Sequence, residues 1–520
     1  MYLKQKIATF MLNRILGIKS DFSNLKEVEK YQVKKLKKKL KIAYTTPYWH
    51  ETLDTICNET NINFEELINN INSISDFQKI VPETTRQVLS DNGSKMTTKP
   101  LSELVEMHTS GTSTNKPVSV YSTSLDMASM SLAMNNICVK GGLTQFSHII
   151  ALFPRESSIW NSDGKVQRVI PNMEFVDLNK VDNEGIIKLL QADGIYSYTN
   201  VYIGLFNKFR DVINDYKNKG GEIKLKALFG GGDFLAKGAI DEIRNILGTN
   251  ITEFNPLISI EAPGVSYMCK KENIHLPNEF YFTEIKPLSE DYYKTRIENL
   301  SSLAKFYELT ELEDLLKEGS NLSNISKQLK EYLIKNNNEL AYETETLTEL
   351  IDKGLNNRIG ELLITNINSK GMHYFRYHTG DVAELVDCDC GALDKSIKMV
   401  GRVQLTEVHK SIRVETVMNI VYTSNSFKTG KISSQPGHIK TYMDGRTRVI
   451  DVYLKKGDSL TAKEDELVIQ ELKDRIKTSD EYVLKLYTSG NIKNWKLNFY
   501  LVDKLSTKNK WLIENKIGDN

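Results

Sequence analysis

The sequence of 520 residues predicts an α/β fold, with a large N-terminal domain of layered sheets and helices over residues 1–400 and a small α+β domain over 401–520. Between residues 148 and 247, buried strand-like runs alternate with helical patterns, as in proteins that layer helices on a sheet. Over about 289–350, leucines recur at helical spacing while strand signals nearly vanish, which indicates a helical insertion. After residue 401, shorter strands accompany one helix.

The first expected helix runs from Asn24 to Ile42. Its apolar residues recur at roughly helical spacing, and lysines, including Lys37 to Lys39, lie between them. Lysine runs on one helix face are usually solvated, so we assign this basic amphipathic helix no function. Between Thr45 and Leu101 the pattern is helical and irregular.

The later elements follow from the apolar runs. Short apolar runs bounded by turn residues predict strands, and longer periodic runs predict helices. Strands are expected over His148–Pro154, Ile223–Gly230, Glu279–Lys286, Gly360–Asn366, Tyr374–Tyr377 and Val382–Val386, and helices over Ile186–Ala192, Tyr202–Tyr216, Leu235–Leu247 and Glu464–Ile476.

The composition excludes several classes of function. Sixty-eight Lys and Arg residues stand against 67 Asp and Glu, so a net charge of +1 gives no general attraction to nucleic acid or anionic lipid. The sequence has no apolar run of about 18 residues, so we expect no transmembrane segment. Five scattered cysteines are unlike a secreted disulfide framework, and the N-terminus lacks an export signal. We therefore expect a cytoplasmic protein.

A hydroxyl-rich loop, HTSGTSTNKPVS at residues 108–119, follows a potential strand. Gly111 allows backbone amides to approach an anion, and Lys116 supplies positive charge. The loop differs from the usual P-loop pattern, but its composition predicts phosphate binding. Its hydroxyl donors are Thr109, Ser110, Thr112 and Ser113.

A glycine-rich segment, FGGGD at residues 229–233, connects an expected strand to an expected helix. Glycines at a strand-to-helix turn permit a phosphate or a flat ligand to approach the backbone closely. Gly231 and Gly232 are therefore candidate ligand contacts, although a simple tight turn accounts for the same pattern.

A third motif, FRYHTGD at residues 375–381, combines an arginine with an aspartate. Arg376 is expected to face phosphate, and Asp381, at the end of a tight Thr-Gly turn, is expected to hold a ribose diol. A glycine-arginine pair, Gly401 and Arg402, begins twenty residues after Asp381.

The order of these motifs resembles that of the adenylate-forming acid ligases, because TSGT is followed by GGGD, a glutamate-containing segment, RYHTGD and GR. More narrowly, the chain resembles the phenylacetate-CoA ligase branch with its capsule-cluster and deazaflavin-coenzyme adenylylating relatives. Two further motifs point to that branch: TPYW at residues 46–49, and CDCG at 388–391 just after TGD. The resemblance spans most of the chain except the insertion.

The resemblance implies a two-step reaction that uses ATP and Mg²⁺. A carboxylate attacks the α-phosphate of ATP to give an acyl-adenylate and pyrophosphate, and an acceptor then displaces AMP. CoA is the expected acceptor, so the implied partners are a small-molecule carboxylic acid and an acyl acceptor. Because two anions must meet, the site needs Mg²⁺ and positioned donors to neutralise charge.

The resemblance also assigns roles to residues. Glu261 would bind Mg²⁺, Asp381 the ribose hydroxyls, and Arg402 the ribose or phosphate near the hinge. Lys510 would be the mobile C-terminal lysine that reaches the acyl-phosphate oxygens, with Lys508 as the alternative. The phosphate loop would comprise Thr109, Ser110, Gly111, Thr112, Ser113 and Lys116, and the adenine and acyl pocket would include Gly231 and Gly232.

Two other functions stay open at this point. The strand-like EFYFTEIK segment at 279–286, with GELLITN and FRYHTGDV after it, also resembles the acyl-acid amido synthetases, in which an amine takes the acyl group. Alternatively, the chain is a non-catalytic nucleotide-binding or partner-binding protein, with the leucine-rich insertion as a surface for a protein partner. The segment LISIE at 257–261, which lacks the aromatic residue of the ligase motif, and the pair Gln404-Leu405 after the hinge favour this alternative.

Three cysteines and a histidine form a candidate metal site. Five residues separate Cys269 from His275, and Cys388 and Cys390 form a CxC pair. Three Cys and one His suffice for a closed tetrahedral zinc site, and the phenylacetate-CoA ligase branch carries Cys and His at similar positions. We therefore predict a structural Zn²⁺ that joins the segment after Glu261 to the segment after Asp381 and takes no part in catalysis.

Overall fold

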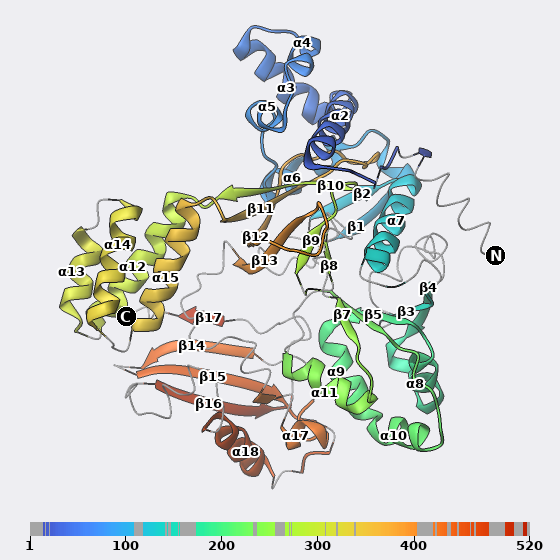
Figure 1. Ribbon diagram of the computed structural model, residues 1–520, viewed down its shortest axis with the longest axis vertical. Coiled ribbons are helices and arrows are strands. Elements are labelled where there is room, and N and C mark those ends of the chain that lie inside the picture. Colours follow the sequence, from blue (N-terminus) through green and yellow to red (C-terminus); the bar gives the residue numbers. More distant parts are fainter. Residues whose placement is uncertain are drawn as a thin grey trace.

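The described residues of the computed structural model form N-terminal helices, a parallel sheet, an antiparallel sheet, a helical insertion and a C-terminal sheet (Figure 1). The structure describes residues 14–15, 17–19, 21–108, 118–140, 143, 147–153, 155, 173–231, 237–254, 266–269, 271, 273–306, 308–318, 321–336, 340–402, 420–421, 424–433, 438–444, 447–457, 459–461, 464–477, 495–503 and 513–516.

Short capped helices dominate the first hundred residues. The Asn24 side chain caps α2 by accepting a hydrogen bond from the amide of Glu27, and Ser73 and Asp76 form a capping box at α5. Their apolar faces share one core, in which Trp49 is buried. The helices are α2 (Leu25–Ala43), α3 (Pro47–Thr60), α4 (Phe64–Asn69), α5 (Ile74–Ile80) and α6 (Arg86–Asn92), followed by the 3-10 turns η1 (Gly93–Met96) and η2 (Leu101–Glu103).

One lysine of α2 is not solvated. Lys39 is only 3% exposed, its ammonium donates a hydrogen bond to the Ser369 hydroxyl, and its Nζ lies 5.4 Å from the centroid of the Phe375 ring. Burial lowers the pKa of Lys39 to about 7. The lysine run expected to lie wholly in solvent therefore includes a packed position, whereas Lys34 on the same helix is exposed.

A two-stranded hairpin follows the helices. Strands β1 (Val105–His108) and β2 (Ser119–Ser122) pair antiparallel, with His108 opposite Ser119. Helix α7 (Ser124–Lys140) begins after β2, where the Asp126 carboxylate accepts hydrogen bonds from the Thr123 amide and hydroxyl. The two strands bring the ends of the predicted phosphate loop together.

The parallel sheet has the strand order β4-β3-β5-β6-β7. All five residues of β3 are buried, as the uninterrupted apolar run predicted. The helix expected over 202–216 is divided in two at Phe209. The elements are β3 (Ile149–Phe153), β4 (Met173–Asp177), η3 (Leu178–Lys180), α8 (Asn183–Leu190), β5 (Gly194–Tyr198), α9 (Thr199–Lys208), α10 (Arg210–Asn218), β6 (Ala227–Gly231), α11 (Lys237–Leu247) and β7 (Thr252–Phe254).

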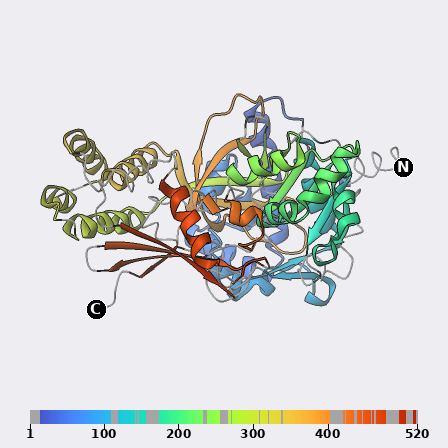
Figure 2. The same cartoon turned by 90° about the horizontal axis from the view of Figure 1, so that it is seen from below.

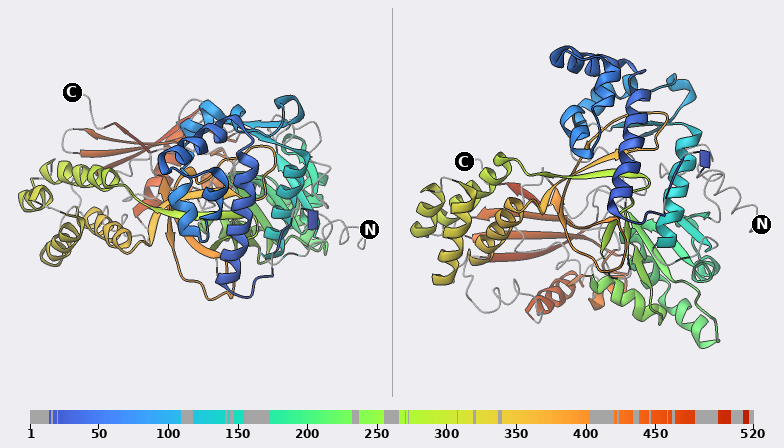
Figure 3. Two further views of the ribbon diagram at one scale, coloured as in Figure 1. Left: turned by 90° about the horizontal axis from the view of Figure 1, so that it is seen from above. Right: turned by 45° about the horizontal axis from the view of Figure 1, so that its top comes forward.

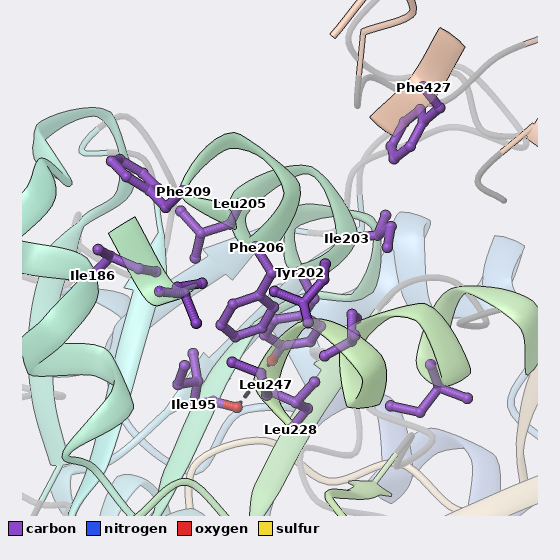
Figure 4. Packing of buried hydrophobic residues seen from close by; sticks show 14 of the residues in the cluster. Ile186, Ile195, Tyr202, Ile203, Leu205, Phe206, Phe209, Leu228, Leu247 and Phe427 are labelled. Atoms are coloured by element: carbon purple, nitrogen blue, oxygen red, sulfur yellow. Dashed lines mark hydrogen bonds between the residues drawn. The ribbon is translucent and has the colours of Figure 1, made fainter. Parts of the chain in front are cut away.

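The core of this region lies between the sheet and its helices (Figure 4). Tyr202 and Phe206 of α9 are buried against the strands, and the Tyr202 hydroxyl donates to the carbonyl of Ile195, 2.9 Å away. That bond satisfies the polar end of a buried aromatic residue. The sheet and its helices therefore share one apolar core.

The antiparallel sheet has the strand order β10-β11-β12-β13-β9-β8. Its strands come from segments far apart in the sequence, because the helical insertion separates β10 from β11. The strands are β8 (Tyr267–Met268), β9 (Ile274–Leu276), β10 (Tyr281–Pro287), β11 (Ile359–Asn366), β12 (Tyr377–Leu385) and β13 (Lys395–Arg402).

Strand β12 corrects the sequence-based prediction of two strands around a Thr-Gly turn. One strand covers residues 377–385, and Thr379, Gly380 and Asp381 lie inside it. The pairing with β11 shifts register there, since Glu361 pairs with Val382 whereas Leu363 pairs with His378. Gly380 has φ of +75°, a conformation that favours glycine. The TGD motif is thus a β-bulge rather than a turn between strands.

The insertion consists of helices α12 (Glu290–Phe306), α13 (Thr310–Glu318), α14 (Leu322–Lys335) and α15 (Ala341–Leu355), which project together from the body of the molecule (Figure 3). Its leucines build its own core, in which Leu312 and Leu329 are fully buried. Among these helices, Ile334 is a large apolar residue that is exposed, at 85%. The leucine spacing that suggested a surface for a protein partner therefore mainly reflects internal packing.

The C-terminal region contains a sheet of strand order β16-β15-β14-β17, with α18 beside it (Figure 2). Lys428 of α17 contacts Glu242 of α11 at 3.2 Å, which links this region to the helices of the parallel sheet. The elements are α17 (Asn425–Lys428), β14 (His438–Asp444), β15 (Thr447–Lys455), α18 (Asp465–Lys477), β16 (Trp495–Val502) and β17 (Ile513–Lys516).

Within the described ranges, none of the helices combines the length and apolar character that a membrane span requires.

Candidate functional site

Asp381 is the candidate nucleotide contact that the structure describes best. The bulge in β12 holds it at 8% exposure, and its backbone amide donates to the Thr379 hydroxyl at 3.1 Å. That hydroxyl in turn donates to the carbonyl of Leu362 at 2.8 Å, so the side chain of the motif threonine closes the bulge. The local sequence Thr-Gly-Asp thus shapes the backbone that carries the carboxylate.

Two further candidates lie at strand ends. Arg402 is the last residue of β13 and stands directly opposite Asp381 in the register of the two strands. Gly231 is the last residue of β6, opposite Tyr198 of β5. The carboxyl ends of parallel strands are where open α/β sheets bind ligands.

The remaining candidates of the nucleotide site lie outside the described residues. They are Thr109, Ser110, Gly111, Thr112, Ser113 and Lys116 of the phosphate loop, Gly232, Glu261, and the C-terminal lysines Lys508 and Lys510.

Arg376 does not have the role that its motif predicted. Its Nε donates to both carboxylate oxygens of Glu284 at 3.0 and 3.1 Å, its Nη1 donates to the carbonyls of Gln78 and Val81, and its Nη2 donates to Glu83 at 3.1 Å. With all three guanidinium nitrogens engaged by protein oxygens, Arg376 joins the antiparallel sheet to the N-terminal helices instead of facing phosphate. Its φ of +50° is unusual for a residue with a side chain.

His378 belongs to the same buried group of charges. Its Nδ1 lies 2.8 Å from Glu361 and its Nε2 lies 2.8 Å from Glu83, which also pairs with Lys286. Sequence reasoning missed Glu83, Glu284 and Glu361, because carboxylates from three distant segments carry no common spacing. One available signal was the grouping of an arginine, a histidine and an aspartate in the segment FRYHTGD at 375–381.

The four predicted zinc ligands come together. Cys269 follows β8, His275 lies in β9, and Cys388 and Cys390 lie between β12 and β13, with all four ligand atoms within 4.8 Å of one another. The sulfurs of Cys269 and Cys388 are 3.7 Å apart, and the Cys390 sulfur is 3.4 Å from Nε2 of His275.

These separations suit zinc. Bond lengths of about 2.3 Å to sulfur and about 2.0–2.1 Å to nitrogen give neighbouring tetrahedral ligands separations of about 3.5–3.8 Å. Nδ1 of His275 lies 3.1 Å from the carbonyl oxygen of Asp394, a contact that leaves Nε2 for a metal. A hydrogen bond with the Asn273 side chain lowers the pKa of the Cys388 thiol, while burial raises the pKa of Cys390. The donor set therefore fits a closed, structural zinc site.

Comparison with known proteins adds the fold family. No protein-family model and no curated protein matches the sequence. The structure of 2-hydroxyisobutyryl-CoA ligase in the postadenylation state with R3-HIB-AMP is similar, at a TM-score of 0.58 and 11% identity over 95% of this chain and 90% of that chain. The chain has the fold of the adenylate-forming enzymes. An open conformation of the same ligase, with 2-HIB-AMP and CoA, has a TM-score of 0.50 at 11% identity over 96% of this chain and 93% of that one.

The adenylate-forming fold confirms the α/β class predicted from the sequence. In the described residues this fold contains a parallel sheet, an antiparallel sheet and a C-terminal sheet. Gly231 and Asp381, which come from motifs about 150 residues apart, lie in different sheets of this fold. The sequence order of the motifs is thus consistent with a site assembled from several sheets.

Proposed function

We propose that the chain is an AMP-forming ligase that activates a carboxylic acid with ATP and passes the acyl group to CoA. A fold similar to that of a CoA ligase over 95% of the chain is the observation that carries the proposal. The motif series in the same order along the sequence supports it. We also propose a division into a large domain of residues 1–400, with an insertion at 289–350, and a mobile domain of residues 401–520.

In the first half-reaction, the carboxylate oxygen of the acid bonds to the α-phosphorus of ATP, and the bond to the pyrophosphate oxygen breaks. Asp381 accepts hydrogen bonds from the ribose hydroxyls, and its burial in the bulge limits the positions that the ribose can take. Arg402 stands opposite Asp381 and adds positive charge beside the ribose or phosphate. Glu261 would hold Mg²⁺, which neutralises charge on the phosphates.

The loop and the C-terminal lysine complete the proposed site. Gly231 and Gly232 line the adenine and acyl pocket, and Lys510 stabilises the charge that develops on the acyl-phosphate oxygens. The β- and γ-phosphates are held by Thr109, Ser110, Gly111, Thr112, Ser113 and Lys116. In the second half-reaction, the thiol of CoA loses its proton and its sulfur bonds to the acyl carbon, while the bond from that carbon to the phosphate oxygen breaks and AMP leaves with the electron pair.

The zinc site has a separate, structural role in this proposal. Zn²⁺ bound by Cys269, His275, Cys388 and Cys390 would join β8 and β9 to the turn between β12 and β13. Because four protein ligands fill a tetrahedral shell, none of its positions is open to substrate.

The test is pyrophosphate release from ATP, with hydroxylamine as the trap for the adenylate, over a panel of aryl, fatty and amino acids. Release with at least one acid is expected, and CoA-dependent AMP release with that acid identifies the acceptor. AMP release that depends on an amine and not on CoA would instead indicate an amide-forming enzyme. Folded protein that binds no ATP and releases no pyrophosphate with any acid would contradict the proposal.

Two substitutions sharpen the test. Asp381→Ala is expected to weaken ATP binding by about tenfold or more, because it removes charged hydrogen bonds to the ribose. Lys510→Ala should depress adenylate formation more than ATP binding, and Lys508→Ala is its matched control. If Lys508→Ala has the larger effect, the catalytic lysine is two positions earlier.

A further inference from the structure

His378 makes hydrogen bonds with two carboxylates at once. Its Nδ1 and Nε2 each lie 2.8 Å from a carboxylate oxygen, of Glu361 and of Glu83 respectively. An ionised carboxylate only accepts hydrogen bonds, and a neutral imidazole has a single N–H donor. Both bonds therefore form only when the ring is an imidazolium, with a proton on each nitrogen.

The surrounding charges favour the imidazolium. The side chains of His378, Glu83 and Glu361 are 17%, 22% and 15% exposed, so water screens them only in part. Both groups that hydrogen-bond the ring are carboxylates, so each of them attracts a positive charge on the imidazole. The group also contains the carboxylate of Glu284 and the cations Arg376 and Lys286, and the charge of Lys395 in β13 acts on Glu284.

The pKa values shift in the directions that this arrangement requires. Burial opposes charge on His378, but the hydrogen bonds and charges of Glu361 and Glu83 outweigh it and raise the pKa of the imidazole. Burial also acts to raise the pKa of Glu83, yet its bonds with Lys286 and His378 lower it overall.

The three partners come from three separate segments. Glu361 lies in β11, Glu83 lies in the connection before α6, and His378 is the second residue of β12. The backbone makes the same connection, since the His378 amide donates to the carbonyl of Thr84 at 3.1 Å. His378 thus holds the start of β12 against both the neighbouring strand and the N-terminal helices.

The bulge begins directly after this anchor. His378 is the last β12 residue paired with β11 before the register shift, and pairing resumes at Val382. Between them lie Thr379, Gly380 and Asp381, whose geometry depends on where the two strands are fixed. A change in the contacts of His378 therefore reaches Asp381 through three residues of backbone.

We propose that His378 is a positioning residue for the nucleotide: its imidazolium, held between Glu361 and Glu83, fixes the bulge that presents Asp381, so that ATP binds less tightly when the ring is neutral. The inference rests on the proposed role of Asp381 in binding ATP. It adds a pH-dependent support to a site whose direct contacts do not themselves include a histidine.

Titration calorimetry of MgATP from about pH 6.5 to about pH 9.5 tests this proposal. The wild-type dissociation constant should rise with pH more steeply than that of His378→Gln, whose side chain has no titrating group. At the acidic end, His378→Gln should bind ATP about tenfold more weakly than the wild type, because the ion pairs of the imidazolium with Glu361 and Glu83 directly before the bulge are lost. For His378→Gln we therefore expect a dissociation constant that is higher than that of the wild type and changes little with pH.

Two further variants separate positioning from a general loss of structure. His378→Arg keeps a permanent charge and several donors, so it should retain most of the affinity without the pH dependence. His50→Gln, at a histidine with 57% exposure that pairs with Asp54, should match the wild type at every pH and so accounts for the titration of ATP itself. Thermal unfolding of each variant at both ends of the pH range shows that the protein is folded.

The possible results distinguish this inference from the proposed function. If the wild type binds ATP and His378→Gln has the same dissociation constant and the same pH profile, the positioning role is wrong while the ligase proposal stands. If His378→Gln only lowers the unfolding temperature, the histidine is structural and the inference is again wrong. If the folded wild type binds no ATP, the proposed function fails, and the inference fails with it.

Discussion

The antiparallel sheet carries two polar clusters of opposite kinds. At β8 and β9, Cys269 and His275 meet two further thiols, and every member is a potential donor to a cation. At β10 to β12, the carboxylates of Glu284 and Glu361 pair with Arg376 and His378. Both clusters join distant segments of the chain, but the first offers ligands to an external cation whereas the second pairs its carboxylates with cations of the chain itself.

The residue types explain why the sequence predicted the thiol cluster but not the charged cluster. A metal accepts only a few side-chain types, so Cys and His stand out from the rest of the sequence. Ion pairs use the commonest surface residues, and their burial alone makes them unusual. A cluster of ion pairs is therefore hard to recognise in the sequence, whereas a set of candidate metal ligands stands out in it.

The largest expected effect is removal of the metal from the thiol cluster. We expect about one zinc per chain by elemental analysis, and its loss in the double variant Cys388→Ser with Cys390→Ser. The unfolding temperature should fall by at least about 5 °C, because metal binding contributes directly to folding. Cys57→Ser, at a buried cysteine outside the cluster, should keep the zinc. A zinc-free wild type of unchanged stability would contradict the assignment.

The next effect is the removal of one partner from the charged cluster. Arg376→Met removes the guanidinium whose Nε contacts both carboxylate oxygens of the buried Glu284, and breaking a buried pair in this way costs about 3–5 kcal/mol. Chemical denaturation measures the change in the free energy of unfolding. Arg358→Met is the matched control, since Arg358 pairs with the 95% exposed Asp387 and should cost only about 0–1 kcal/mol. Equal losses in the two variants would show that burial of the pair is unimportant.

A smaller effect is expected when both partners are removed. Adding Glu284→Leu to Arg376→Met replaces the buried carboxylate that has lost its ion pair with Arg376 by an apolar side chain, so part of the stability should return. The coupling energy from the double-mutant cycle should be about 1–3 kcal/mol. Strictly additive losses would mean that the two side chains do not interact in solution.

A change of pH should have the smallest effect on stability, and it compares the two clusters most directly. The raised pKa of His378 means that its contribution to stability is fully present below its unfolded pKa of about 6.5 and is lost as pH rises through the folded value. Zinc ligands must lose protons to bind, so the thiol cluster instead weakens as pH falls. Unfolding temperatures at alkaline pH should therefore separate wild type from His378→Gln less than those at neutral pH do. A gap that widens with pH would contradict this sign.

Several elements could be read from the sequence because they depend on local patterns. The apolar run around Ile150 predicts a buried strand, the periodic leucines around Leu312 predict helices, and both are confirmed. The division of the helix at Phe209 and the single strand through Asp381 could not be predicted, because tertiary packing and strand pairing decide them. Among the candidate site residues, the four expected metal ligands come together, whereas Arg376, which was expected to face phosphate, contacts Glu284.

The sequence by itself determined the α/β class, the helical nature of the insertion and the residue types at the candidate metal and nucleotide sites, since periodicity and chemically rare residues are local properties of the chain. The tertiary structure alone decided which charges meet. The residue types of Arg376 and His378 are the same whether the side chains face a phosphate or a carboxylate, so the sequence does not reveal their partners. Only the pairing of β10, β11 and β12, and the packing of the N-terminal helices on them, brings Glu83, Glu284 and Glu361 within reach.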